Sequence, residues 1–189
     1  MKIVKVLLYT AVFILFIAGC ALAYNQLANR LPGQELQTEQ TGGPQTDGAD
    51  NRIKAPDFTV VDADGNEVKL SDMEGMPIVL NFWASWCPPC KDEMPHFDTV
   101  YKELGGEVLF MMVDLVDGSR ETVDKGSAYI AELGYAFPVY FDVNGEAAYE
   151  FAVQSIPFTL FIDSEGYLVT VARRAINEAT LRKGIELIL

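Results

Sequence analysis

The sequence has 189 residues, half of them hydrophobic and 22% charged, which suits one packed domain preceded by a tail. Its formal net charge is −13, and beyond Lys2 and Lys5 the chain carries 12 basic against 27 acidic residues. A surface this acidic repels nucleic-acid phosphates and anionic lipid headgroups. Nucleic-acid binding is therefore excluded, and the N-terminal segment alone is expected to anchor the protein at a membrane.

Residues 1–24 are predicted to be a signal or anchor segment. Lys2 and Lys5 precede residues 6–24, which lack charge and reach about the 20-residue length that spans a bilayer. The positive-inside rule then places the rest of the chain outside the cytoplasm. Residues 17–20, Ile-Ala-Gly-Cys, resemble the lipobox of bacterial lipoproteins, in which Cys20 would become lipid-modified after cleavage. An uncleaved transmembrane helix is the alternative. Either form leaves the domain on the extracytoplasmic side of the cell membrane.

Residues 25–53 are predicted to be a flexible linker, because Gln, Gly, Thr, Asn and Asp dominate and few side chains could be buried. Residues 54–189 form the predicted domain. It begins with expected strands over 57–62 and 67–70 on either side of an Asp-Gly turn. The apolar run 77–83 predicts a strand buried on both faces. Helical spacing of apolar residues predicts a helix over 88–104, stopped by two glycines.

The second half continues the alternation. We expect a strand over 108–113, a helix over 121–133, a strand over 139–142 and a short helix over 146–151. Strands over 158–163 and 167–171 form a predicted hairpin, and Asn177 is expected to cap a last helix that runs to the C-terminus. This order predicts an α/β fold with a mixed central sheet.

Cys87 and Cys90 lie three residues apart where the buried strand meets the helix, a spacing that a disulfide can bridge. The positive end of the helix favours a thiolate, so we predict that Cys87 attacks and that Cys90, one turn further in, resolves. Thiol-disulfide exchange needs no metal or organic cofactor beyond this pair. A zinc site is the alternative, but it would have only His96 and the distant Cys20 as further His or Cys ligands. A purely structural disulfide is the other.

Residues 81–91, Asn-Phe-Trp-Ala-Ser-Trp-Cys-Pro-Pro-Cys-Lys, resemble the active site of the thioredoxin superfamily. More closely, they are similar to the membrane-anchored TlpA/ResA-like thiol-disulfide oxidoreductases. Similarity continues at 55–58, 93–95 and 161–166. The resemblance implies a thioredoxin fold, a mixed central β-sheet flanked by helices, with an N-terminal β-hairpin and a central helical insertion supplied by 121–133.

The resemblance also implies which residues meet the substrate. Ile156 and Pro157 match the family's cis-proline loop, which lies against the cysteine pair and offers backbone groups to an extended chain. Trp86, Pro88 and Pro89 are expected to contact the substrate from the cysteine side.

Glu93 matches an active-site acid of the ResA-like branch. Glu93 lies one helical turn beyond Cys90, where a partly buried carboxyl group would suit proton transfer with that thiol. The alternative is that Glu93 is a solvated helix residue without such a role. Two positions depart from the family. Asn81 stands where cytoplasmic thioredoxins carry a buried aspartate, and Phe158 stands where threonine or serine is usual. We expect Phe158 to make the groove beside the sulfurs bulkier and more apolar.

The resulting expectation is a monomeric protein-disulfide oxidoreductase that reduces disulfides in exported proteins, with apocytochromes c as candidate substrates and a membrane thiol donor as electron source. A thiol peroxidase is one alternative, although its Thr-x-x-Cys pattern is replaced here by Cys87 at the earlier position. A copper-binding or chaperone module is another, although it would resemble Cys-x-x-x-Cys with a distal histidine, and no histidine follows His96.

Overall fold

The computed structural model describes residues 52–73 and 75–189. The predicted anchor 1–24, Cys20 and almost all of the predicted linker lie outside the described residues. Within the described part, no helix is both long and apolar enough to cross a membrane.

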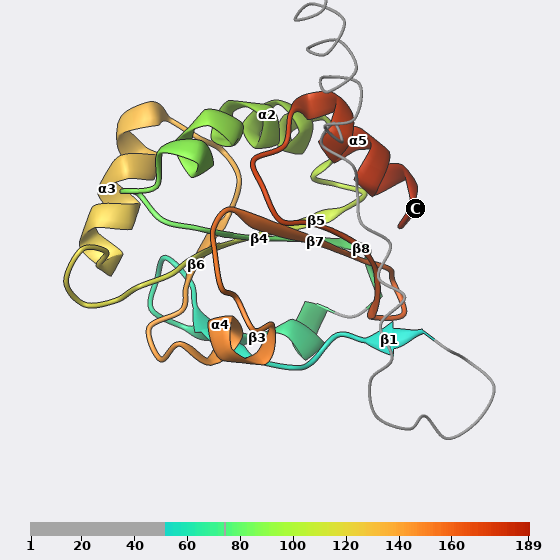
Figure 1. Ribbon diagram of the computed structural model, residues 1–189, viewed down its shortest axis with the longest axis horizontal. Coiled ribbons are helices and arrows are strands. Elements are labelled where there is room, and N and C mark those ends of the chain that lie inside the picture. The colour runs from blue at the N-terminus through green and yellow to red at the C-terminus, as the bar shows by residue number, and fades with distance from the viewer. Residues whose placement is uncertain (1–51, 74) are drawn as a thin grey trace, which may run out of the picture. The chain divides into compact units, whose positions relative to one another are not determined.

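Four strands form the centre of an eight-stranded sheet with the order β1-β8-β7-β4-β5-β6-β2-β3 (Figure 1). Strands β4 (Ile78–Trp83), β5 (Leu109–Asp114) and β6 (Val139–Phe141) are parallel, and β7 (Phe158–Ile162) runs antiparallel to β4. Every residue of β4 is buried, as its continuous apolar run predicts for a strand covered on both faces.

The edges of the sheet are built from short strands. A hairpin of β2 (Thr59–Val61) and β3 (Glu67–Lys69) joins the sheet where Val61 pairs with Phe141 of β6. At the other edge, β8 (Tyr167–Ala172) pairs with β7, and β1 (Ile53–Lys54) pairs with β8. The sheet thus begins at Ile53, one residue before the expected domain start.

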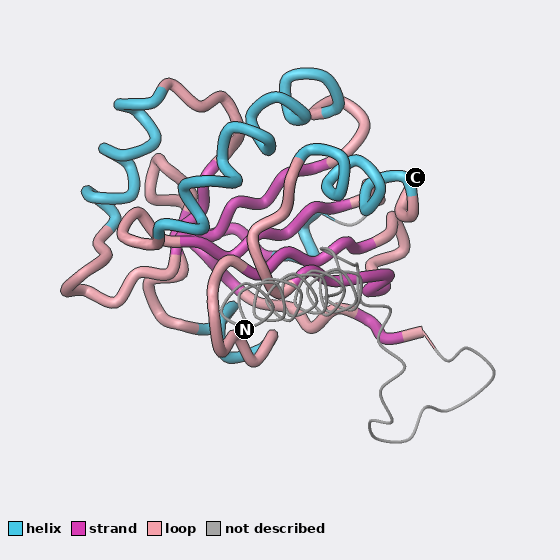
Figure 2. Tube along the Cα trace, turned by 45° about the horizontal axis from the view of Figure 1, so that its top comes forward, coloured by secondary structure: helices cyan, strands magenta, loops and turns pink. Residues whose placement is uncertain are grey.

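The long helices cover one face of the sheet. Figures 1 and 2 show α2 (Pro88–Leu104), α3 (Val123–Leu133) and α5 (Glu178–Glu186) on that face, and α4 (Glu146–Glu150) with the 3-10 helix η1 (Leu70–Met73) on the other. The predicted thioredoxin fold is confirmed, with β2-β3 as the N-terminal hairpin and α3 as the central helical insertion.

Three predicted helix boundaries were wrong; the smallest difference is in α4, which ends at Glu150 because Phe151 is its cap. The helix expected over 121–133 begins only at Val123, because Thr122 is its cap and accepts the backbone N–H of Lys125 at 3.3 Å. Glu121 is therefore outside the helix and buried. The last helix ends at Glu186 rather than at the C-terminus, while Asn177 caps its start as expected.

Candidate active site

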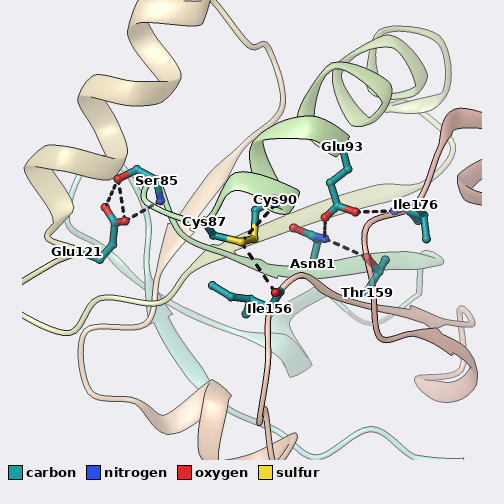
Figure 3. The surroundings of a disulfide bond; sticks show 9 residues. All are labelled: Asn81, Ser85, Cys87, Cys90, Glu93, Glu121, Ile156, Thr159 and Ile176. Atoms are coloured by element: carbon teal, nitrogen blue, oxygen red, sulfur yellow. Dashed lines mark hydrogen bonds between the residues drawn. A yellow bond between two sulfur atoms is a disulfide. The ribbon is translucent and has the colours of Figure 1, made fainter.

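The two cysteines form a disulfide at the start of α2, with their Cα atoms 5.3 Å apart (Figure 3). Cys87 is the helix cap, and its sulfur accepts the backbone N–H of Cys90 at 3.3 Å. Cys87 is 3% exposed and Cys90 is fully buried. Since Pro88 and Pro89 carry no N–H, the N–H of Cys90 is the first amide of the helix, and it and the positive end of the helix face the sulfur that was predicted to attack.

The Ile156–Pro157 peptide bond is cis, as the family resemblance implies. The carbonyl oxygen of Ile156 lies 3.9 Å from the sulfur of Cys87. This contact arises because β7, which begins directly after Pro157, pairs with β4, which leads into the cysteines. Backbone polar groups thus lie next to the reactive sulfur.

A surface pocket with a volume of about 410 Å³ opens beside Cys87. Its wall includes four of the five residues predicted to meet the substrate: Trp86, Pro88, Pro89 and Ile156. The fifth, Pro157, is buried next to it. Trp86 is 41% exposed, a large apolar surface left open at the mouth. The remaining lining residues are Leu115, Asp117, Arg120, Val153, Gln154 and Ser155. A largely apolar pocket with a few polar groups can hold a side chain of an extended peptide.

Glu93 is 1% exposed, so the alternative of a solvated helix residue is wrong. Its two carboxyl oxygens accept hydrogen bonds from the side-chain amide of Asn81 and the backbone N–H of Ile176, each at 2.9 Å (Figure 3). Burial raises the pKa of Glu93 to about 8, although these two hydrogen bonds oppose the shift. A carboxyl group with this pKa exchanges its proton near neutral pH. Its role in proton transfer stays a prediction.

Asn81, the residue that replaces the thioredoxin aspartate, holds Glu93 in place. It is fully buried on β4, and its side-chain nitrogen donates to Glu93 and to the hydroxyl of Thr159, both at 2.9 Å. Its side-chain oxygen has no hydrogen-bond partner among the described residues. The strand position thus carries an amide that supports the carboxyl group of Glu93 on the helix.

Glu121 is a site residue that the sequence analysis missed. Its carboxylate is fully buried and accepts the backbone N–H of Ser85 at 2.6 Å and the hydroxyl of Ser85 at 2.8 and 2.9 Å (Figure 3). Ser85 lies two residues before Cys87, so Glu121 fixes the loop that leads into Cys87. No local pattern reveals this contact, because the two residues are 36 positions apart.

Asp114, at the end of β5, is a second missed acid. It is fully buried, and neither carboxyl oxygen has a hydrogen-bond partner in the part of the chain described. Burial first, and then repulsion from Glu121 and Asp117, raise the pKa of Asp114 to about 8. Gly126 of α3 packs directly on this carboxyl group, and any side chain there would overlap it.

Phe158 is 3% exposed and stacks on Phe82 on the face away from the long helices, so the prediction that it makes the groove beside the sulfurs bulkier and more apolar was wrong. In residues 52–73 and 75–189, no three His, Cys, Asp or Glu side chains are grouped so as to hold a metal ion. That the reaction needs no metal or cofactor stays a prediction.

Residues 52–171 match the AhpC/TSA family. The thiol-disulfide oxidoreductase ResA of Oceanobacillus iheyensis is 35% identical over 137 residues, covering 68% of this chain and 70% of the relative. ResA of Bacillus subtilis is 30% identical over 175 residues, covering 93% and 89%. The exposed lipoprotein thioredoxin Etrx1 of Streptococcus pneumoniae has a solved structure that is 31% identical, with a TM-score of 0.61 over 70% of this chain and 100% of that one.

Proposed function

Since the chain belongs to the AhpC/TSA family and, within it, to the ResA-type thiol-disulfide oxidoreductases, we propose that it reduces disulfides of exported proteins while tethered to the extracytoplasmic side of the membrane. Family membership gives the activity, and the proposal concerns direction, place and substrate. The observation that carries it is the Cys87–Cys90 pair at a helix start with the buried acid Glu93 one turn behind.

In the proposed cycle the Cys87 thiolate attacks one sulfur of a substrate disulfide. The substrate S–S bond breaks, a mixed disulfide forms, and the leaving thiolate takes a proton from water. Deprotonated Cys90 then attacks the sulfur of Cys87, which forms the Cys87–Cys90 bond and releases the second substrate thiol. Two electrons pass from the protein to the substrate, and a membrane thiol donor restores the dithiol by the reverse steps.

Glu93 is proposed to accept the proton of Cys90 in the second step. Cys90 is fully buried, so its proton has no direct path to bulk water. Glu93 lies one turn further along α2 and is itself buried, with a pKa of about 8. A base whose pKa is close to the working pH is effective in both directions of proton transfer.

The buried acids also favour the reducing direction. Negative charge near the sulfurs disfavours the thiolate, and destabilising the dithiol form lowers the reduction potential of the pair. Glu93 lies one helical turn beyond Cys90, and Glu121 accepts hydrogen bonds from Ser85, two residues before Cys87; both acids are buried. A strong oxidant of the same fold would need the opposite arrangement.

The proposed location depends on the N-terminus. The uncharged run 6–24 and the lipobox-like residues 17–20 support a lipid anchor on Cys20 or a single transmembrane helix. A relative described as an exposed lipoprotein thioredoxin adds support for the first form. Apocytochromes c as substrates, a membrane thiol donor and a monomeric state complete the proposal.

The direction is tested by equilibrating the purified domain with glutathione buffers. A reduction potential below about −200 mV supports a reductase, and a value well above it contradicts one. Cys87→Ala and Cys90→Ala are matched controls that remove the pair without altering the buried acids. For location, Cys20→Ser should release the full chain from membranes if Cys20 carries the lipid, whereas retention would favour a transmembrane helix.

Oxidation by hydrogen peroxide distinguishes the proposed reductase from a thiol peroxidase. If hydrogen peroxide oxidises the reduced chain faster than a protein disulfide does, the thiol peroxidase replaces this proposal. Tight, stoichiometric copper binding by the dithiol would instead favour the copper-binding or chaperone module.

A further inference from the structure

The rim of the disulfide site is basic although the domain is acidic. Residues 52–189 contain 23 acidic and 11 basic residues. Four of those basic residues are close to the cysteines or the proline loop in the chain or in the sheet: Arg120 in the pocket wall, Lys91 directly after Cys90, and Arg173 and Arg174 after the β8 residue that pairs with Thr159. All four are exposed.

Arg120 is the best-placed of the four. Its guanidinium carbon lies 4.1 Å from the centre of the Trp86 ring, and both residues line the pocket beside Cys87. Its Nε donates to Asp117 at 3.2 Å, which fixes the plane of the group. Its two terminal nitrogens have no hydrogen-bond partner among the described residues. A guanidinium held flat in this way presents two parallel N–H donors, the geometry that matches a carboxylate.

On the proline side, Arg173 and Arg174 follow Ala172 of β8, which pairs with Thr159. The guanidinium carbon of Arg173 lies 4.6 Å from the centre of the Phe158 ring, on the face of the sheet away from the cysteines, so Arg173 does not line the pocket. On the cysteine side, the ammonium group of Lys91 lies 4.9 Å from the centre of the Tyr129 ring.

One acidic group shares the pocket wall with Arg120. Of the described residues that line the pocket, Asp117 is the sole acid, and it pairs with Arg120 through Nε alone. Its carboxylate also accepts the backbone N–H groups of Ser119 at 2.8 Å and Glu121 at 3.0 Å. Glu121 itself is buried and bonded to Ser85. The terminal nitrogens of Arg120 therefore remain the donors that an incoming chain can reach.

We propose that the site selects partner segments that carry acidic side chains beside their cysteines, and that Arg120 is the specificity-determining residue. This inference rests on the proposed function, because it names the substrate class of the same site. The acidic surface of the rest of the domain repels acidic segments. It therefore disfavours their binding anywhere except beside the pocket, where Arg120 attracts them.

The test uses three disulfide-bonded peptides that differ only in the residue beside each cysteine, which is Glu, Gln or Lys. The reduced full chain is mixed with each, and the second-order rate constant of peptide reduction is measured. We expect the Glu peptide to react about threefold faster than the Gln peptide and the Lys peptide to be slowest, a size typical of exposed ion pairs. Salt at about 1 M should abolish the order, because the screening length falls to about 3 Å.

Two variants test whether Arg120 causes the preference for the Glu peptide. Arg120→Gln should bring the ratio of Glu to Gln peptide rates close to one, and Arg120→Lys should keep part of the preference. Lys102→Gln is the matched control, since it removes one cation from the last turn of α2, where Lys102 pairs with Asp98 at 2.6 Å. It should leave the ratio unchanged.

Two results would overturn the inference while the oxidoreductase stands: equal rates for all three peptides, or a ratio that Arg120→Gln does not alter. A common slowing of all three peptides by Arg120→Gln with the ratio kept would also overturn it, because the residue would then act on Cys87. If no peptide is reduced at all, the proposed function fails, and the inference fails with it.

Discussion

Replacing Glu93 by glutamine should change how the free energy of unfolding depends on pH. The ordinary pKa of a glutamate is 4.5, and burial raises that of Glu93 to about 8 in the folded protein. Between these values the folded state binds more protons than the unfolded one, so stability is fully present below pH 4.5 and is lost as the pH rises through 8. At about 1.4 kcal/mol per pH unit, the loss has an upper bound of about 5 kcal/mol.

Glu93→Gln cannot ionise, so this loss should disappear. The two carboxyl oxygens accept one hydrogen bond from Asn81 and one from Ile176. A glutamine side chain has one oxygen to accept one of these hydrogen bonds, and its NH2 group would then face the other N–H donor. That mismatch should cost about 1–3 kcal/mol at pH 5. The curves are therefore expected to cross, with the variant less stable than the wild type at pH 5 and more stable at pH 9.

Urea unfolding of the oxidised protein at pH 5, 7 and 9 measures this directly. Glu186→Gln makes the same chemical change on an exposed position of α5 and should leave the pH dependence as it is. Parallel curves for wild type and Glu93→Gln would refute the reasoning, because they would mean that Glu93 titrates alike in the folded and unfolded chains.

Three further variants test other parts of the structure. Glu121→Gln should weaken the hydrogen bonds to Ser85 and lower the free energy of unfolding by about 1–3 kcal/mol. It should also lower the pKa of Cys87, measured from the pH dependence of its alkylation rate; an unchanged pH dependence would contradict this. Gly184→Ala should cost about 1–3 kcal/mol in urea unfolding, since a Cβ would overlap the ring of Phe161. Asn177→Ala should cost about 0.5–2 kcal/mol by removing the cap on the backbone N–H of Thr180, and no loss would contradict the cap.

Local patterns in the sequence predicted the elements that present the cysteines. The helix expected over 88–104 is α2 with the same bounds, because prolines favour its first turn and glycines end it. The apolar run before it became the buried strand β4. By contrast, β1 (Ile53–Lys54) is too short to show any periodicity.

Tertiary contacts explain what the sequence could not predict. Asn81 and Glu93 were each identified, one as a departure and one as an acid, but the hydrogen bond between them joins a strand to a helix. Phe158 was misplaced because alternation along β7 directs it away from the cysteines and toward Phe82. Glu121 and Asp114 were missed because only the folded chain brings α3 and its preceding loop against the end of β5.

The central claim is that Cys87 captures the substrate and Cys90 releases it. Full-length chains carrying Cys90→Ala or Cys87→Ala can be expressed in cells, quenched with acid and alkylated, and then separated without reducing agent. The claim predicts mixed disulfides through Cys87 in the Cys90→Ala chain, with exported proteins attached, and far fewer in the Cys87→Ala chain. Adducts mainly through Cys90, or none in either variant, would contradict it.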